Sequence, residues 1–383
     1  MMNQKKKLYA ATAVLCLSSI AHAQSTVTLY GAIDVGLDFA NNSGGKQVWH
    51  LQDGTFDGMM PSRWGLKGGE DLGGGLKAIF KLENGFDVTN GELLQYGREF
   101  GREAWVGLSD ARLGTVTLGR QYDSVVDYLQ PTTMDGNAGG LAFHAGDIDN
   151  TGDSFRVSNS IKYAGNDIHG LTFGGMLGLS NSNAEGTSKI GMWSAGAAYV
   201  TGSLRVAAAY LFAKQPATEF PDGNYVANTT GAAIGATGTF SYVGNPASEQ
   251  IAGAGATYTL GKATMGLSYT NVNFGQANGT HSSVIFNNYE AWGSCAFTPS
   301  VTVTAGYTFT DGRVGYSSAR PKYHQINLAA SYNLSKSTLL YASMGYQIAA
   351  GASQPADIFE GVVANASSTN HQLGTRLGMV HLF

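Results

Sequence analysis

Two arginines and three acids of one segment could together select ions by their charge. Residues 114–163 comprise two strand-like stretches, GTVTLGRQYD and SFRVSNSIKYAG, joined by a long link rich in Gly, Asp, Asn and Thr. Arg120 lies on the first stretch and Arg156 on the second. A link of this length, residues 123–154, usually has a function of its own. Basic and acidic groups that face each other across water concentrate one kind of ion and exclude the other. The acids that could face the arginines are Asp127, Asp135 and Asp147.

Catalytic and metal-binding chemistry has little support in the sequence. There is no Gly-x-Ser-x-Gly motif, and the histidines are scattered without the spacing of a metal site. Residues 147–153 resemble the start of a calcium-binding loop, but Ser158 occupies the position of the bidentate glutamate. We therefore expect no catalytic residue, no metal and no cofactor.

The chain begins with a segment typical of a secretory signal peptide. Three lysines at positions 5–7 precede an apolar run over residues 8–20, and Ala21-His22-Ala23 gives the small-x-small cleavage pattern. We therefore expect residues 1–23 to be removed, and residues 24–383 to form the mature domain. Cleavage also removes Cys16, which leaves Cys295 without a partner for an intramolecular disulfide.

The composition excludes several classes of protein. Charged residues make up 13% of the chain, about half their usual share of roughly 25%. No apolar run after the signal reaches the roughly 18 residues of a transmembrane helix. The formal net charge is -4, and loss of the signal's three lysines makes the mature chain more acidic still. Nucleic acid is therefore not an expected partner, because binding it requires a basic surface.

Alternation of apolar and polar residues dominates the mature chain. In residues 26–39, Val27, Leu29 and Ile33 share one parity, and Asp34 lies on the other. A period of two over such a length exceeds that of most soluble strands and suffices to cross a bilayer with about 9–11 residues. We predict sixteen strands, over residues 26–39, 62–70, 76–83, 102–109, 114–122, 155–164, 170–181, 191–200, 204–213, 250–259, 263–274, 287–297, 301–310, 323–333, 337–348 and 370–383.

The connections between these strands alternate between short and long. Short turns such as residues 110–113 and 260–262 are followed by long Gly-, Asn- and Ser-rich links such as residues 123–154 and 214–249. This order is typical of an up-and-down barrel in an outer membrane. We therefore predict an all-β fold, a sixteen-stranded antiparallel transmembrane β-barrel. Residues 232–242 have some strand character, but one more strand would make the number odd, so we assign them to the fifth long loop, where a local hairpin is equally possible.

The charges support this assignment of faces. A Lys or Arg on the lipid face costs about 2–4 kcal/mol at the bilayer midplane. The basic residues on the polar parity are Arg63, Lys67, Lys77, Lys81, Arg156, Lys162, Arg205 and Arg376. Arg120 is an exception, because it shares parity with Val116 and Leu118. Since Gly119 permits a β-bulge, we expect a bulge to turn Arg120 inward.

Several motifs together resemble the general diffusion porins of Gram-negative outer membranes, of the beta-proteobacterial type. They are TLYGAIDVGL, SRWGLKGGEDLGGGLKAIFKLENGF, AWVGL, GTVTLGRQYD, NSIKY and the terminal Phe383. The resemblance implies a homotrimer in the outer membrane, whose third long loop folds into the lumen opposite basic wall residues. By matching motif, those are Arg63, Arg120 and Arg156. It also implies contact with membrane lipid and lipopolysaccharide, and recognition of Phe383 by the barrel-assembly machinery.

We expect a passive channel for small hydrophilic solutes and ions. The predicted inner parity has more basic than acidic residues, which favours a mild preference for anions. The further side chains that we expect to line the pore are Lys67, Lys77, Lys81, Lys162 and Arg205. Two alternatives are a substrate-specific channel, which needs an aromatic slide or a dense basic ladder, and a non-conducting structural or adhesin barrel plugged by its own side chains.

Overall fold

The computed structural model describes residues 25–180, 190–220, 238–353, 355–359 and 363–383. The predicted signal peptide, residues 1–23, lies outside the described residues.

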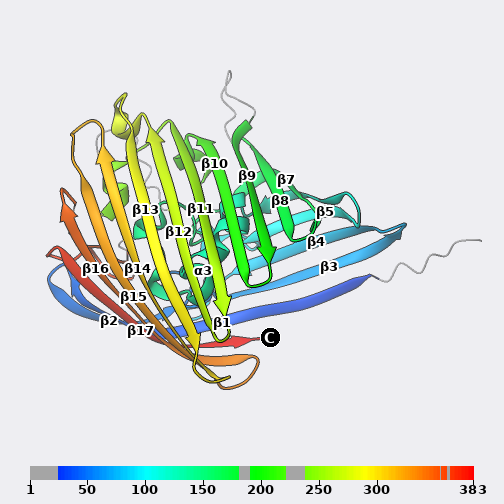
Figure 1. Ribbon diagram of the computed structural model, residues 1–383, viewed down its shortest axis with the longest axis horizontal. Helices are drawn as coiled ribbons and strands as arrows, with labels where there is room; N and C mark the ends of the chain where they lie inside the picture. The colour runs from blue at the N-terminus through cyan, green and yellow to red at the C-terminus, as the bar shows by residue number, and fades with distance from the viewer. Residues whose placement is uncertain (1–24, 181–189, 221–237, 354, 360–362) are drawn as a thin grey trace, which may run out of the picture.

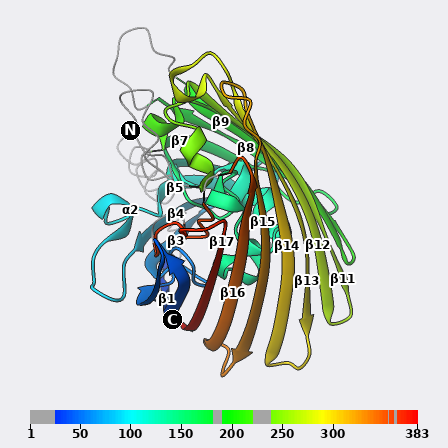
Figure 2. The same cartoon turned by 90° about the vertical axis from the view of Figure 1, so that its left-hand side faces the viewer.

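Sixteen strands form a closed antiparallel barrel, as the alternation predicted (Figure 1, Figure 2). Each strand pairs with its neighbours in chain order, and β17 pairs with β1 to close the ring. The barrel strands are β1 (Thr26–Ser43), β3 (Arg63–Gly73), β4 (Leu76–Gly85), β5 (Glu103–Asp110), β6 (Gly114–Gln121), β7 (Val157–Ala164), β8 (Leu171–Leu179), β9 (Ile190–Thr201), β10 (Leu204–Lys214), β11 (Ser248–Leu260), β12 (Ala263–Gly275), β13 (Val284–Ala296), β14 (Val301–Val314), β15 (Pro321–Asn333), β16 (Thr338–Gly351) and β17 (His371–Leu382). Every predicted strand is therefore confirmed.

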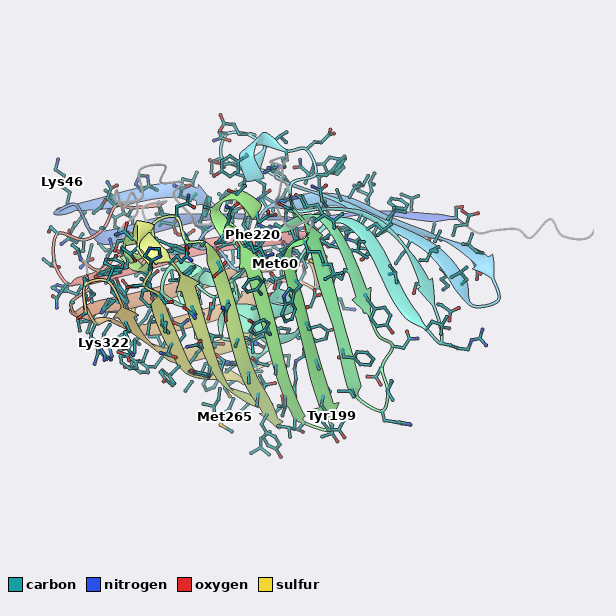
Figure 3. The ribbon with its side chains drawn as sticks, turned by 90° about the horizontal axis from the view of Figure 1, so that it is seen from above. Lys46, Met60, Tyr199, Phe220, Met265 and Lys322 are labelled. Atoms are coloured by element: carbon teal, nitrogen blue, oxygen red, sulfur yellow. The ribbon has the colours of Figure 1, made fainter. Side chains whose placement is uncertain are left out.

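The side chains of each strand alternate between the interior and the outer surface. In β15, Tyr323 and Gln325 are 1% and 2% exposed, whereas Ile326 and Leu328 are 45% and 43% exposed. Figure 3 shows Met265, another exposed apolar residue, projecting from the outside of the wall. An outer surface with so many large apolar side chains is stable in hydrocarbon and not in water, so the fold requires a membrane around it.

A tight glycine turn after Glu70 joins β3 to β4. Gly73, Gly74 and Gly75 all have positive φ, at 86°, 64° and 90°. The carboxylate of Asp71 accepts a hydrogen bond from the Gly73 amide at 2.8 Å. A residue with a Cβ would be strained at these φ angles, which explains the run of glycines in this turn.

One strand was not predicted. β2 (Lys46–Asp53) folds back on β1 through a turn at Gly44 and Gly45, both with positive φ. It pairs with residues 35–43 of β1, whereas β3 pairs with residues 26–32. β2 therefore extends the wall beside the second half of β1, where β3 does not reach. Because β2 only adds to this part of the wall, the ring of the barrel still has sixteen strands.

The structure describes only part of residues 232–242, which the sequence analysis assigned to the fifth long loop. Gly238–Tyr242 forms a short 3₁₀ helix and no strand, which agrees with its place in a loop. The rest of the possible hairpin, residues 232–237, lies outside the described residues. In the described parts of the chain, no helix is long and apolar enough to span a membrane.

Candidate functional site

The third long loop crosses the barrel interior. We call residues 123–154 loop 3. Its short helices are η1 (Val125–Leu129), η2 (Gln130–Thr132), α3 (Asp135–Ala138), η3 (Gly140–Ala142) and η4 (Ala145–Asp147). η1 and η2 contact β9 to β12, and η3 contacts β15, β16 and β17. Figure 1 shows α3 behind the strands of the near wall. Loop 3 thus reaches from one side of the lumen to the other.

Inward-facing side chains of the wall fix loop 3 in this position. The indole Nε1 of Trp292 donates a hydrogen bond to the Thr132 carbonyl at 2.9 Å. The Met134 amide donates to Glu290 at 3.1 Å, and the Gln325 amide group donates to the Leu141 carbonyl at 2.9 Å. Because backbone groups of a loop must be satisfied when they are buried, these bonds hold the loop against the wall.

A second anchor holds the returning part of loop 3. His144 Nδ1 lies 2.6 Å from Asp149 Oδ2, and Asn288 donates to the same carboxylate at 3.0 Å. Thr270 also hydrogen-bonds to Asp149. Burial alone would raise the pKa of Asp149, but His144 and the hydrogen bonds lower it to about 2. Asp149 is therefore a charged structural anchor at neutral pH.

One side of the lumen is filled by an apolar core. At their long-loop ends, β8 to β14 direct apolar side chains inward, and loop residues cover them. Phe155 and Phe220 stack at 3.9 Å between ring centroids, and Phe220 lies inside the outline of the barrel in Figure 3. The buried members on the strands include Met176, Met192, Leu211, Ile251, Val272, Phe274, Val284, Phe286 and Val314. On the opposite side of the lumen, charged side chains of β3 and β4 point inward and stay partly exposed, so we call this the open side.

A cluster of basic side chains, Arg63, Lys81, Arg102 and Arg156, lies on that open side. We call it the basic cluster, and two of its arginines share one acceptor. Arg102 and Arg156 both donate hydrogen bonds to the Tyr122 hydroxyl, at 2.7 Å and 2.8 Å. Arg156 also donates to Asp153 at 2.8 Å, and Arg102 donates to Glu83 at 2.7 Å. Burial raises the pKa of Tyr122 to about 12, so its hydroxyl stays neutral and acts as the shared acceptor.

A second layer of charges lies next to this pair. Lys81 contacts Glu103 and lies 3.3 Å from Glu83. Arg63 Nε lies 3.9 Å from the same Glu83 carboxylate. The side chains of Arg63 and Lys81 are 25% and 24% exposed although they point inward, which indicates water at this place. Lys67 is exposed nearby, with its Nζ 5.0 Å from the ring centre of Tyr30.

The predicted loop acids have different surroundings. Asp127, which was expected to face the arginines, forms an ion pair with Lys162 instead. Asp147 instead accepts hydrogen bonds from Gly152 and Ser154 within loop 3. Asp135 begins α3, next to the exposed Gly136 and Asn137. The loop acid that contacts the arginines is Asp153, which the sequence analysis did not select.

Arg120 takes a position that differs from our expectation. The predicted bulge is present, because the register between β6 and β7 shifts between Gly119 and Gln121. The pairing with β5 continues unbroken, however, and places Arg120 opposite Ala104, on the side of the exposed Val106. Its guanidinium donates to the Gly101 and Arg156 carbonyls. The bulge therefore does not turn Arg120 toward the lumen, because it loosens only the pairing with β7.

The remaining predicted residues are spread along the barrel. Lys77 is exposed near the turn that joins β3 and β4, and Arg205 donates to the Tyr128 carbonyl of loop 3 at 3.2 Å. Phe383 closes the ring, because its amide donates to the Gly31 carbonyl at 3.1 Å and its carbonyl accepts from the Gly31 amide at 2.9 Å. The missed residue Arg102 directly precedes β5. As the first residue of the predicted strand 102–109 it shares parity with Ala104 and Val106, which the alternation assigns to the lipid face.

A third charged cluster joins loop 1, residues 54–62, to the wall. Arg376 Nη1 donates to Asp38 at 2.7 Å and to Asp57 at 2.9 Å, and its Nη2 lies 3.4 Å from Asp34. All four side chains are at most 1% exposed. The Gly140 amide of loop 3 donates to the Gly58 carbonyl at 2.8 Å. Arg376 therefore supports loop 1, and loop 1 in turn supports loop 3.

Substitution of Arg376 by glutamine should strongly destabilise the barrel. The change leaves three buried carboxylates without their only cation among the described contacts, and breaking such a buried cluster costs about 3–5 kcal/mol. Urea titration of the folded form, followed by its altered migration on unheated gels, measures the loss. Arg112→Gln is the matched control, because Arg112 is exposed in a short turn. A loss as small as that of the control would contradict a supporting role for Arg376.

Comparison with known proteins assigns the chain to one protein family. The model of a Gram-negative porin family matches residues 10–349. The chain is 34% identical over 230 residues to an outer membrane porin protein of Bordetella pertussis, an alignment that covers 54% of this chain and 59% of that protein. It is 29% identical to outer membrane porin protein 32 of Delftia acidovorans, with 99% of this chain and 100% of that protein covered.

Solved structures share the fold. An anion-selective porin from Comamonas acidovorans superposes with a TM-score of 0.74 at 24% identity, over 94% of this chain and 100% of that one. The trimer form of OmpT from Vibrio cholerae gives a TM-score of 0.68 at 16% identity, over 94% of this chain and 99% of that one.

Proposed function

Because this chain belongs to the Gram-negative porin family, we propose that it forms a water-filled channel in the outer membrane for passive diffusion of small hydrophilic solutes and ions. The observation that carries the proposal is the pair of partly exposed inward side chains, Arg63 and Lys81, on the side of the lumen that the apolar core leaves open. Loop 3 narrows this passage. The family consists of channels and not of enzymes, so no catalytic residue is assigned.

The narrowest part of the channel lies between loop 3 and the basic cluster. On the wall we assign Arg63, Lys81, Arg102 and Arg156, and on loop 3 Asp153 and Asp135. Glu83 is matched by three cations and Asp127 by Lys162, so much of the acidic charge is compensated locally. With Glu103 and Asp153 included, the four wall cations face three acids, and this excess of one positive charge favours a mild preference for anions. The anion selectivity named for the Comamonas neighbour is consistent with this preference.

Liposome swelling tests the proposed function. Vesicles that contain the purified protein should swell in small uncharged sugars, and the rate should fall smoothly as the sugar grows, because a general channel selects by size. A strong preference for one sugar over others of equal size would instead indicate a substrate-specific channel. Absence of swelling, with folded protein in the vesicles, would indicate a structural or adhesin barrel.

The preference for anions should weaken as pH rises. Burial, with the nearby acids Asp153 and Glu290, raises the pKa of Asp135 to about 7. Asp135 is therefore neutral below about pH 7 and becomes negative above it, which adds acidic charge to the narrow part. We expect the anion preference, measured as a reversal potential, to be larger near pH 5.5 than near pH 8.5 by about 5–10 mV, a fraction of the roughly 59 mV limit for a tenfold gradient.

Asp135→Asn is the variant that tests this assignment. Asparagine keeps the shape of the side chain and cannot ionise, so the pH dependence should flatten toward the low-pH value. A variant whose reversal potential changes with pH as steeply as that of the wild type would show that another group titrates.

We further propose that the chain acts as a homotrimer in contact with outer-membrane lipid and lipopolysaccharide. The trimer form of the Vibrio neighbour supports the oligomeric state. β3 to β8 have 8–11 residues, whereas β10 to β17 have 11–14, so one side of the wall is lower and suits contact with other subunits. The barrel-assembly machinery would recognise β17 and its terminal Phe383, where the ring closes.

A further inference from the structure

Two aromatic rings and two lysines lie side by side on the inner face of β1, β3, β4 and β5. Lys67 on β3 is directly paired with Lys81 on β4, and Lys81 is directly paired with Trp105 on β5. Tyr30 of β1 adjoins the other end of this row, since the Nζ atoms of Lys67 and Lys81 lie 5.0 and 5.8 Å from its ring centre. We call these four residues the ring-lysine row.

The ring-lysine row adjoins the basic cluster and shares Lys81 with it. Lys67 lies four residues beyond Arg63 on β3, which is about 13 Å nearer the short turn at about 3.3 Å per residue. Tyr30 and Trp105 are half-buried and Lys67 is exposed, although their contacts place all three side chains on the inner face. A solute that has passed the narrow part therefore meets these side chains next.

Hydrogen bonds fix both rings by their polar ends. The Tyr30 hydroxyl donates to Glu83 at 2.8 Å, and the indole Nε1 of Trp105 donates to Glu103 at 3.0 Å. Because the rings are already held, little conformational entropy is lost when a solute contacts them. Tyr and Trp side chains with a satisfied polar end and a free apolar ring are enriched at binding surfaces for this reason.

The two lysines differ in how their charge is compensated. Lys81 contacts Glu103 and lies 3.3 Å from Glu83. Within the part of the chain that the structure describes, no acid forms an ion pair with Lys67, and its amino group lies over the Tyr30 ring instead. Like charges directly opposite each other on paired strands destabilise the pair. An anion between Lys67 and Lys81 removes this repulsion.

We propose that the ring-lysine row binds aromatic carboxylates on their passage through the channel. The carboxylate contacts the amino groups of Lys67 and Lys81, and its ring stacks on the indole of Trp105. Trp105 lies two strands from Lys67, about 10 Å across the sheet, and the flexible lysine side chain spans the distance to a carboxylate on the stacked ring. This inference rests on the proposed function, because the row is reached through the lumen.

Anions without a ring use only part of this site. Chloride or acetate can contact the exposed Lys67, but a single exposed ion pair contributes little to binding. An uncharged ring can stack on Trp105 but leaves the repulsion between the lysines in place. The combination of a planar ring and a carboxylate therefore binds better than either group alone.

Single-channel recordings of the purified full chain in chloride salt test the site at neutral pH, where both test acids are ionised. Benzoate should reduce the chloride current at about three- to tenfold lower concentration than cyclohexanecarboxylate, whose charge is the same but whose ring is saturated and puckered. Benzyl alcohol, which has the aromatic ring without the charge, should reduce the current least.

Three variants assign the parts of the site. Trp105→Leu should bring the effective concentration of benzoate to that of cyclohexanecarboxylate, whereas Trp105→Phe keeps a ring and should retain the preference. Lys67→Gln should raise the effective concentrations of both carboxylates about two- to fivefold. The matched controls are Trp193→Leu, which removes an indole from the outer face, and Lys262→Gln, which removes an exposed cation from a short turn.

The outcomes separate this inference from the proposed function. Equal effects of benzoate and cyclohexanecarboxylate on the wild type would overturn the aromatic class. A preference that persists in Trp105→Leu, or a Lys67→Gln variant that behaves like Lys262→Gln, would overturn the assigned residues. A protein that conducts chloride but shows no preference for benzoate contradicts only this inference, whereas one that does not conduct contradicts the proposed function.

Discussion

Replacement of residues 135–140 by two glycines should raise the single-channel conductance about twofold or more, since conductance follows the cross-section of the narrowest part. The removed residues contain α3, whose Gly136 and Asn137 are exposed in the middle of the loop that crosses the lumen. The ends of the deletion stay fixed, because Met134 is bonded to Glu290 and Leu141 to Gln325. The barrel should therefore close normally, and planar-bilayer recordings give the conductance directly.

A deletion elsewhere provides the control. Residues 88–91 form part of an exposed turn in which the Asp87 amide donates to the Glu92 carbonyl at 2.9 Å. Shortening this turn should leave the conductance unchanged. If the loop 3 variant conducts no better than this control, loop 3 does not limit the flow, and the narrowest part must be sought in another loop.

Neutralisation of Arg63, Lys81 and Arg156 by glutamine should abolish the preference for anions. These side chains lie on the open side of the lumen, and their removal leaves Glu83 and Asp153 less compensated. Arg102 is retained because it holds Glu83 at 2.7 Å and keeps that carboxylate in place. In a tenfold salt gradient, where a perfectly selective channel gives about 59 mV, we expect the reversal potential to move about 20 mV toward the cation limit.

The control for this variant removes the same charge elsewhere. Arg112→Gln/Lys262→Gln/Lys336→Gln affects three exposed short turns, which lie beyond a Debye length from the narrow part and are screened by salt. A reversal potential that moves equally in both variants would mean that total charge, and not the basic cluster, sets the selectivity. An unchanged value in the first variant would place the selectivity filter outside this cluster.

The barrel could be predicted from the sequence because the membrane constrains each strand. Lipid outside and water inside impose a period of two, which residues 325–328 of β15 show: Gln325 and Asn327 are buried and polar, and Ile326 and Leu328 are exposed and apolar. The same rule failed at the long-loop ends of β10 to β14. There Leu211, Phe274 and Phe286 are apolar on the inner face, because loops and not water cover them. These apolar inner faces could be predicted only from the path of the loops that cover them, and the alternation of residues along a strand does not contain that path.

The narrow part was predicted less completely than the barrel. Arg63 and Arg156 both lie in the basic cluster, whereas Asp127 pairs with Lys162 and not with an arginine. Arg102 was missed because it has the lipid-facing parity of the predicted strand 102–109, whereas the structure places it just before β5. Asp153 was missed because it lies in a turn, with a φ of 61°, where parity has no meaning. Arg120 was expected to face the lumen and does not. The bulge shifts the pairing of β6 with β7 but leaves the pairing of β6 with β5 unbroken.

The unpredicted hairpin had a usable signal. Gly44 and Gly45 adjoin a stretch, Lys46–Asp53, that contains Val48, Trp49 and Leu51, and a Gly-Gly pair before such residues is typical of a tight turn. The stretch has eight residues, as many as β5, but it pairs with residues 35–43 of β1, beyond the part of β1 that pairs with β3. An assignment made only of strands in the barrel ring therefore leaves it out.

Conductance of the purified, folded protein in a planar bilayer tests the central claim most directly. A closed barrel with an apolar outside and a partly exposed basic interior should produce discrete, ohmic conductance steps, and a salt gradient should give a small reversal potential on the anion side. Folded protein that inserts into the bilayer without producing steps would contradict the channel.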